Sequence, residues 1–202
     1  MSPALFGAFV GATAILMVIP GPNVALIVAN SLAFGARGGL VTVAGTSAAM
    51  VVQLTVAALG VTALLRALAQ AFELLRWLGV AYLVWLGARA WRAPANDLSR
   101  THAVSPAKTF GRGFLVSLTN PKTLAFYAAF LPQFLDPSAP LGRQMAILSV
   151  TFVSIALIID GGWALLAGRA RGLISRFGRL RNKLTGTALI GAAVGLALAR
   201  RP

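Results

Sequence analysis

The sequence predicts an all-α polytopic membrane protein, with six transmembrane helices arranged as two inverted repeats of three helices. Hydrophobic residues make up 58% of the 202 residues, charged residues only 11%, and the mean hydropathy is +0.82. Such a chain has too little polar surface to cover a soluble globule of this size, so we expect it to lie in lipid. Six apolar stretches approach the roughly 20 residues that cross a hydrocarbon core. They cover 4–29, 39–65, 70–88, 113–134, 145–167 and 184–199.

The first stretch is interrupted near its middle by Pro20, Gly21, Pro22 and Asn23. Proline lacks a backbone donor and clashes with the preceding turn, so the break frees carbonyl groups and leaves unpaired N–H groups at the start of the next half-helix. At membrane depth such groups are tolerated only where protein buries them or where they line a watery cavity. The pattern favours a binding site at this break, and a proline kink repaired by neighbouring helices is the alternative. No Lys or Arg precedes Arg37, so a secretory signal peptide is not expected here.

The second stretch carries Thr46 and Gln53, which lie two helical turns apart and therefore on one face. We expect this face to form hydrogen bonds inside the helix bundle or to line a pore. The third stretch is the weakest, because Arg76 and Arg89 bound a short apolar segment. It can cross a membrane only if its charged ends reach back to the headgroups or if the helix extends toward the N-terminus.

The only long polar stretch, 91–112, follows the third span. We expect it to be a linker that divides a single membrane domain, 1–202, into a first repeat, 1–90, and a second repeat, 113–202. A unit of three spans crosses the membrane an odd number of times. A second copy of that unit must therefore be inverted relative to the first.

The fourth stretch is interrupted in the same manner as the first, by Asn120, Pro121 and Lys122. Paired interrupted helices in two halves of a membrane protein are the best sequence indication of a transporter's binding site. We therefore predict that these three residues and Pro20 to Asn23 bind a substrate. The residues that match between the two breaks are few, so chance similarity is an alternative to a true repeat.

Two ionisable residues fall near the centre of a span, Lys122 in the fourth and Asp160 in the fifth. Each costs about 2.5 to 3.5 kcal/mol at mid-bilayer, so each indicates a function with a partner to be named. In the functional interpretation, Lys122 and the half-helix N-termini bind a carboxylate, while Asp160 binds either a proton or a substrate ammonium. The alternatives are a permanent ion pair between the two residues, or an Asp160 that lies in water nearer the cytoplasmic end of its span.

The net charge of +14 indicates topology more than a nucleic-acid partner. Most of the 18 Lys and Arg residues follow the first, third and fifth spans, which places those basic loops in the cytoplasm and both termini outside. There they would contact anionic lipids of the bilayer, and no nucleic acid is expected to bind. Small-residue pairs such as Gly7 with Gly11 and Gly191 with Gly195 predict tight internal packing or the face of a homodimer.

Several segments together resemble the lysine exporter (LysE) and homoserine/threonine efflux (RhtB-type) family of bacterial inner-membrane proteins. The resemblance covers nearly the whole chain and its length. The matching residues are Pro20 to Asn23, Ala44-Gly45, Phe72 to Arg92, Asn120 to Phe134 and Asp160.

This resemblance implies a secondary transporter that exports amino acids or their derivatives from the cytoplasm by proton antiport. It implies a substrate-binding role for the two proline motifs and a proton-coupling role for Asp160. It does not choose between threonine, homoserine, lysine, leucine or a lactone as substrate. Five-span arrangements with the N-terminus inside have been considered for relatives, whereas the charge distribution here favours six spans with it outside.

Other classes of protein have less support. The chain has no cysteine, phosphate-binding loop, nucleophile elbow or cluster of metal ligands, so we expect no enzyme, no cofactor and no bound metal. An exporter of a metal cation or another small solute is the nearest alternative, although Asp160 alone is fewer carboxylates than a metal pathway needs. A non-transporting membrane scaffold is the other alternative, and it would tolerate apolar residues in place of Lys122 and Asp160.

Overall fold

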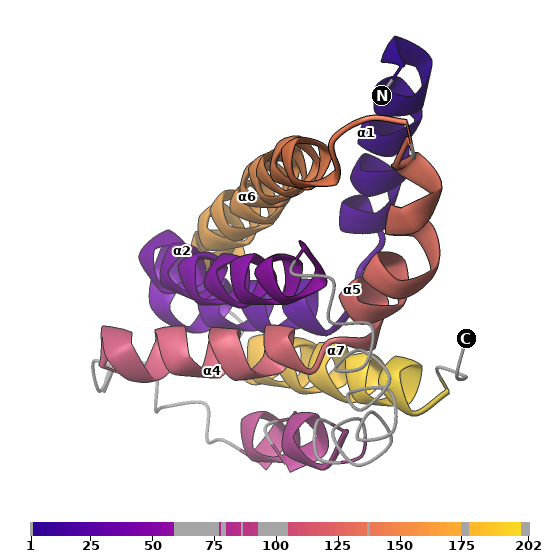
Figure 1. Ribbon diagram of the computed structural model, residues 1–202. Helices are drawn as coiled ribbons and strands as arrows, with labels where there is room; N and C mark the ends of the chain where they lie inside the picture. The colour runs from indigo at the N-terminus through magenta and orange to yellow at the C-terminus, as the bar shows by residue number, and fades with distance from the viewer. Residues whose placement is uncertain are drawn as a thin grey trace.

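The computed structural model describes residues 2–58, 77, 80–85, 87–92, 105–136, 138–174 and 178–198. Every regular element within these ranges is helical, in agreement with the all-α prediction (Figure 1). The elements are α1 (Pro3–Val18), α2 (Pro22–Ala58), α4 (Pro106–Leu118), α5 (Pro121–Ala125), the π-helix η2 (Phe126–Phe130), the 3-10 helix η3 (Leu131–Phe134), α6 (Leu141–Ile174) and α7 (Gly178–Leu198). The end of the predicted second span, most of the third and the middle of the predicted linker lie outside the described residues.

The first break lies where the prolines predict it. Ser2 caps the start of α1, since its hydroxyl accepts from Leu5 N at 3.2 Å. The helix ends at Val18, and the chain resumes helical geometry at Pro22. Pro22 suits a first helical position because its missing N–H would have no partner there.

α2 is two helices joined at one residue. Gly35 has φ 78° and ψ 179°, a conformation that is essentially restricted to glycine. Residues 22–34 fold back along 36–58, and Asn30 Nδ2 donates to Thr42 Oγ1 at 2.8 Å across the pair. The predicted spans 4–29 and 39–65 leave residues 30–38 between them. In the structure these residues belong to α2, and a single glycine with positive φ reverses the chain there.

α4 begins at Pro106, earlier than the predicted start of the second repeat at 113. Residues 106–112 of the predicted linker are therefore helical. Two glycines explain how closely this helix approaches α2. A Cβ at Gly113 would lie 2.7 Å from the carbonyl oxygen of Thr42, and a Cβ at Gly45 would collide with the carbonyl oxygen of Phe110. Larger side chains at these two positions would force the helices apart.

The second break is also present. α4 ends at Leu118, Thr119 and Asn120 are non-helical, and α5 begins at Pro121. The helical geometry then changes from α to π at Phe126 and to 3-10 at Leu131. The segment from Pro121 to Phe134 thus continues as one irregular helical rod.

α6 extends beyond the predicted span 145–167, and α7 begins before the predicted span 184–199. α6 has 34 residues and runs beyond the apolar stretch at both ends, because charged residues such as Arg143 and Arg171 continue the helix where hydropathy falls. Leu141–Arg171 of α6 and Pro22–Ala58 are long and apolar enough to cross a membrane by length and composition.

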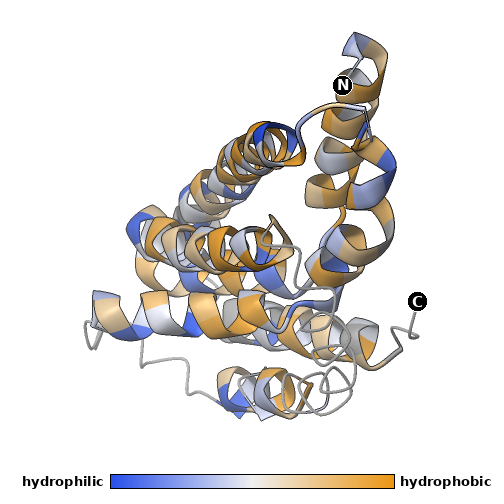
Figure 2. Cartoon of the chain, in the orientation of Figure 1, coloured by the Kyte–Doolittle hydropathy of each residue, from blue (hydrophilic) through white to orange (hydrophobic). Residues whose placement is uncertain are grey.

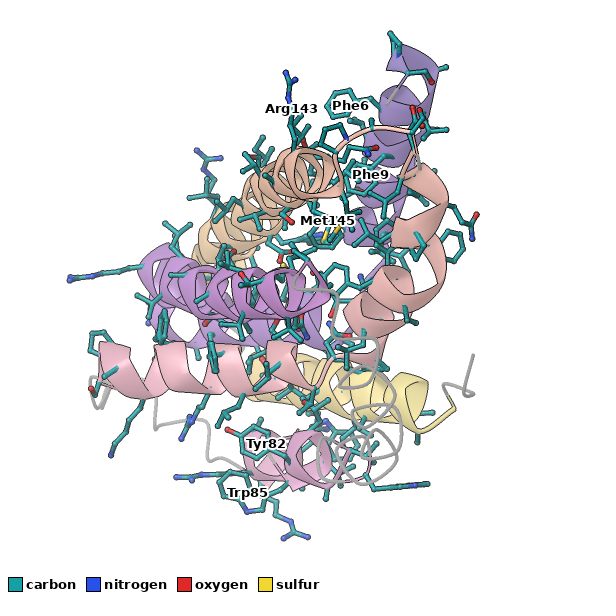
Figure 3. All side chains as sticks on the ribbon, viewed as in Figure 1. Phe6, Phe9, Tyr82, Trp85, Arg143 and Met145 are labelled. Atoms are coloured by element: carbon teal, nitrogen blue, oxygen red, sulfur yellow. The ribbon has the colours of Figure 1, made fainter. Side chains whose placement is uncertain are left out.

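An aromatic cluster joins α1 to the segment after the second break. The rings of Phe9 and Phe134 meet edge to face with centroids 5.2 Å apart, and Phe9 also lies 6.1 Å from Phe126. In Figure 3, Phe6 and Phe9 of α1 point toward Met145 of α6, so side chains fill the space between these helices. These contacts hold both breaks close to α6.

The outer surface is apolar, as a lipid-facing surface must be. Figure 2 shows hydrophobic residues along most of the length of the helices. Ile158 and Val150 on α6 are 74% and 68% exposed. Trp85 is 50% exposed and points away from the bundle in Figure 3, and Arg89 lies 5.6 Å from the centroid of its ring, whereas Tyr82 packs against a buried cluster. Exposed aromatic and cationic side chains of this kind suit a membrane–water interface.

The small-residue pairs do not all pack internally. A Cβ at Gly7, Gly11, Gly191 or Gly195 would meet no atom of the described residues within 4 Å. Gly39, in contrast, lies against Ser31 and Ala164, where a Cβ would be 2.9 Å from the Ala164 Cβ. The expectation of tight internal packing is therefore wrong for the pairs on α1 and α7.

Candidate functional site

A side chain from the second half of the sequence closes the C-terminal end of α1. Lys122 Nζ donates to the carbonyl oxygens of Leu16 and Ile19, at 2.8 Å each. A Cβ at Gly21 would lie 3.5 Å from Lys122 Cε, so the link between α1 and α2 packs against the lysine side chain. Carbonyl groups at a helix end have no intrahelical partner. Lys122 therefore satisfies groups that the first break exposes.

Conversely, a side chain from the first half of the sequence caps the C-terminal end of α4. Gln53 Nε2 donates to the carbonyl oxygens of Ser117 and Leu118, at 3.0 Å each. Gln53 is 7% exposed, so these bonds are shielded from solvent. The second break is thus capped from the first half, and the first break from the second half.

Ser117 connects three elements at the second break. Its hydroxyl accepts from Asn23 Nδ2 at 3.1 Å and donates to the carbonyl oxygen of Thr46 at 3.0 Å. The Thr46 hydroxyl itself bonds within its own helix, to Val43 O. Both Thr46 and Gln53 therefore lie inside the bundle. Thr46 joins this network through its backbone carbonyl group, and Gln53 joins it through its side-chain amide.

The other residues of the proline motifs shape the breaks. Pro22 and Pro121 begin their helices, and Asn120 Oδ1 accepts from Lys122 N at 3.0 Å as an N-cap. Pro20 and Gly21 form the non-helical link, where Pro20 is exposed. The predicted substrate-binding residues thus gather around two breaks joined by hydrogen bonds.

Asp160 lies in the middle of α6 and is 1% exposed. Neither of its carboxylate oxygens has a hydrogen-bond partner among the described residues. This burial contradicts the alternative in which Asp160 lies in water. Buried polar groups in proteins are nearly always hydrogen-bonded, and a buried carboxylate without a partner is a pronounced exception.

Lys122 and Asp160 do not form a direct ion pair. Within the described part of the chain, no contact within 4 Å joins the ammonium to the carboxylate, and the two charges act on each other only at longer range. The lysine is held by backbone carbonyls instead. The alternative of a permanent ion pair therefore does not describe this conformation.

Other buried polar atoms near the breaks also lack hydrogen-bond partners within the described ranges. They include Asn23 Oδ1, Ser47 Oγ, Gln53 Oε1 and Asn120 Nδ2. Sequence reasoning did not single out Ser117. A signal for Ser117 exists, because it precedes Asn120 by three residues and so faces the same break.

The sequence profile of the LysE type translocators matches residues 14–200. This chain belongs to the LysE-type translocator family. Members of the family are translocators and not enzymes, which agrees with the expectation from the sequence. Family membership also establishes that this LysE-type protein is a membrane protein.

Three relatives of this LysE-type chain match along most of their length. A homoserine/homoserine lactone efflux protein of Salmonella typhimurium is 33% identical over 197 residues, which cover 96% of each chain. A leucine efflux protein of Salmonella choleraesuis is 32% identical over 90% of this chain and 89% of its own. An uncharacterized membrane protein of Vibrio cholerae is 32% identical over 92% of this chain and 93% of its own. No solved structure gives a significant match.

Proposed function

We propose that this LysE-type translocator exports amino acids or amino-acid derivatives from the cytoplasm and that proton antiport drives the export. The efflux activities named for its relatives support an amino-acid substrate. The observation that carries the proposal for this chain is the buried carboxylate of Asp160, which has no hydrogen-bond partner among the described residues. A partnerless carboxylate in an apolar bundle needs a cation, and both a proton and a substrate ammonium can fill that role.

The same break offers groups for the substrate carboxylate. A lysine ammonium has three N–H donors, and Lys122 uses two of them on Leu16 and Ile19. No other described residue bonds the third N–H or the Nδ2 of Asn120, so both are available to a carboxylate. We therefore propose that Pro20, Gly21, Pro22, Asn23, Asn120, Pro121 and Lys122 form the substrate site, with Asp160 as the residue that exchanges protons.

Six spans in two inverted repeats remain our proposed architecture. Each half contains a helix, a break, and then a helical segment that begins with proline. Each half also caps the break of the other half, because Lys122 closes α1 while Gln53 closes α4. We further propose the bacterial inner membrane as the location, with the basic loops cytoplasmic and both termini outside. A homodimer stays a prediction.

The proposal is tested with purified protein in liposomes, under an imposed pH gradient and with a panel of labelled amino acids. We expect flux of one or a few amino acids that collapses when the gradient is removed. Asp160→Asn should abolish the dependence on the gradient while the protein elutes as a folded species. Proton coupling that persists in this variant would refute the role of Asp160.

Asp136→Asn is a matched control for that variant. Asp136 lies in the loop before α6, where the amide and hydroxyl of Ser138 donate to its carboxylate. These bonds hold the pKa of the Asp136 carboxyl below its usual value. The Asp136→Asn substitution should therefore leave the dependence of transport on the proton gradient unchanged. No amino-acid flux from a folded wild-type protein would favour the scaffold or metal-cation alternatives.

A further inference from the structure

Three helices meet in an apolar layer close to the first break. Ile27, Val43 and Ala164 are buried and form one hydrophobic cluster. They come from the first half of α2, the second half of α2 and α6 respectively. This layer fixes how the three helices face one another, so the residues one turn away can be placed.

The directions of the three helices are set by contacts on the far side of that layer. Asn30 bonds Thr42, so the two halves of α2 are antiparallel. A Cβ at Gly168 of α6 would lie 2.7 Å from the Ala36 Cβ, while a Cβ at the later residue Gly39 would lie 2.9 Å from the Ala164 Cβ. α6 is therefore antiparallel to the second half of α2 as well.

One helical turn from the layer, toward the break, the three positions are polar. A step of four residues returns to the same face of a helix. From Ile27, Val43 and Ala164 it leads to Asn23, Ser47 and Asp160. The step goes toward the N-terminus in the first half of α2 and in α6, and toward the C-terminus in the antiparallel second half of α2. All three steps therefore lead toward the same end of the bundle, and the three polar side chains form the next layer.

The polar layer contains acceptors without donors. Asn23, Ser47 and Asp160 are 4%, 6% and 1% exposed. Asn23 Oδ1, Ser47 Oγ and both oxygens of Asp160 have no hydrogen-bond partner among the described residues. The Nδ2 of Asn23 is already bonded to Ser117 Oγ, which orients the amide and leaves its oxygen free. Adjacent unpaired acceptors from three helices indicate a missing donor with several N–H groups.

We propose that Asn23, Ser47 and Asp160 form the subsite for the primary ammonium group of the exported amino acid. This inference rests on the proposed function and names the part of the substrate that these residues recognise. An ammonium has three N–H donors, one for each side chain, and its charge compensates Asp160. A proton on Asp160 would satisfy at most one of the other acceptors. Proton and ammonium therefore compete for one carboxylate, as exchange requires.

The first test compares competitors in the liposome assay. The probe is the labelled amino acid that wild-type protein transports best, challenged with its unlabelled form, its N-acetyl derivative and its N-trimethyl derivative. The two derivatives lack the three N–H donors, so we expect each to inhibit at least about tenfold more weakly than the parent. A thermal-shift titration in detergent with the same three compounds gives an independent readout of binding.

Ser47→Ala is the second test, with Ser31→Ala as its matched control. The Ser31 hydroxyl is also buried, but it donates to Ile27 in its own helix. Ser47→Ala should raise the apparent KM for the parent amino acid about tenfold with little change in the maximal rate. Ser47→Thr keeps a hydroxyl and should restore most of the affinity, while Ser31→Ala should keep the wild-type KM.

Several outcomes would overturn the subsite. If wild-type flux is intact but the N-acetyl derivative competes as well as the parent, the ammonium is bound elsewhere and the proposed function stands. The same conclusion follows if Ser47→Ala and Ser31→Ala have equal KM values. If flux instead requires Na⁺ and Ser47→Ala changes that requirement, the layer holds Na⁺ and not the ammonium. Absence of any amino-acid flux would overturn both this inference and the proposed function.

Discussion

Lys122 Nζ lies 2.8 Å from the carbonyl oxygen of Leu16, although the two residues are 106 positions apart in the sequence. This bond joins the end of α1 to the start of α5 and makes one charged side chain part of both breaks. Gln53 makes the reciprocal connection to the end of α4. Each interrupted helix therefore depends on the other half of the chain for its exposed carbonyls, and this dependence can be measured.

Replacement of Lys122 by Met should destabilise the protein through loss of a helix cap. Two carbonyls would lose their donor, which corresponds to about 1 to 3 kcal/mol. The measurement is unfolding in detergent for Lys122→Met, Asp160→Leu and the double variant. Because the two charged groups do not pair directly, we expect a coupling energy below about 0.5 kcal/mol. A coupling energy above about 1 kcal/mol would instead show that a direct ion pair forms.

Gln53→Leu should have a similar effect at the second break. The amide donates to Ser117 O and Leu118 O, and leucine leaves both carbonyls buried without that donor. We expect a loss of about 1 to 3 kcal/mol in the free energy of unfolding. Thr55→Ala serves as the control, because the exposed Thr55 hydroxyl bonds only to Val51 in its own helix. Equal stabilities of the two variants would count against the cap.

Asp160→Leu should stabilise the fold while it abolishes transport. The carboxylate is buried and has no donor among the described residues, so an apolar side chain removes an unfavourable group. We expect the midpoint of thermal unfolding in detergent to rise by a few degrees, about the effect of 1 kcal/mol. A lower midpoint would mean that Asp160 holds the bundle together, as a structural residue does. Opposite effects on stability and transport are typical of functional residues.

Gly35→Ala should destabilise the reversal between the two halves of α2. The left-handed conformation of Gly35 costs a residue with a Cβ about 1 to 3 kcal/mol. A Cβ there would also lie 3.1 Å from the side chain of Arg171. Gly7→Ala is the control, since Gly7 is inside α1 with open space around its Cβ position, and alanine should slightly favour that helix. A Gly35→Ala variant as stable as Gly7→Ala would contradict this account.

Local chemistry made several features predictable. Pro20, Pro22 and Pro121 located both breaks, because proline acts on its own neighbours in the chain. The position of Asp160 within an apolar stretch was sufficient to mark it as a functional candidate. Hydropathy predicted the ends of helices less well, since α6 continues through Arg143 and Arg171. Arginine favours helical backbone, and its long side chain can reach water from a helix end.

The sequence by itself thus determined the helical class, the membrane environment and the sites of interruption, because these follow from hydropathy and from the missing N–H of proline. Only the tertiary structure decided the partners. Whether Lys122 meets Asp160 or the carbonyls of α1 depends on contacts between residues far apart in the chain, as does the placement of Asp160 beside Asn23 and Ser47. The sharp reversal at Gly35 is decided the same way, because a glycine permits a left-handed turn and the packing of α2 against itself selects it.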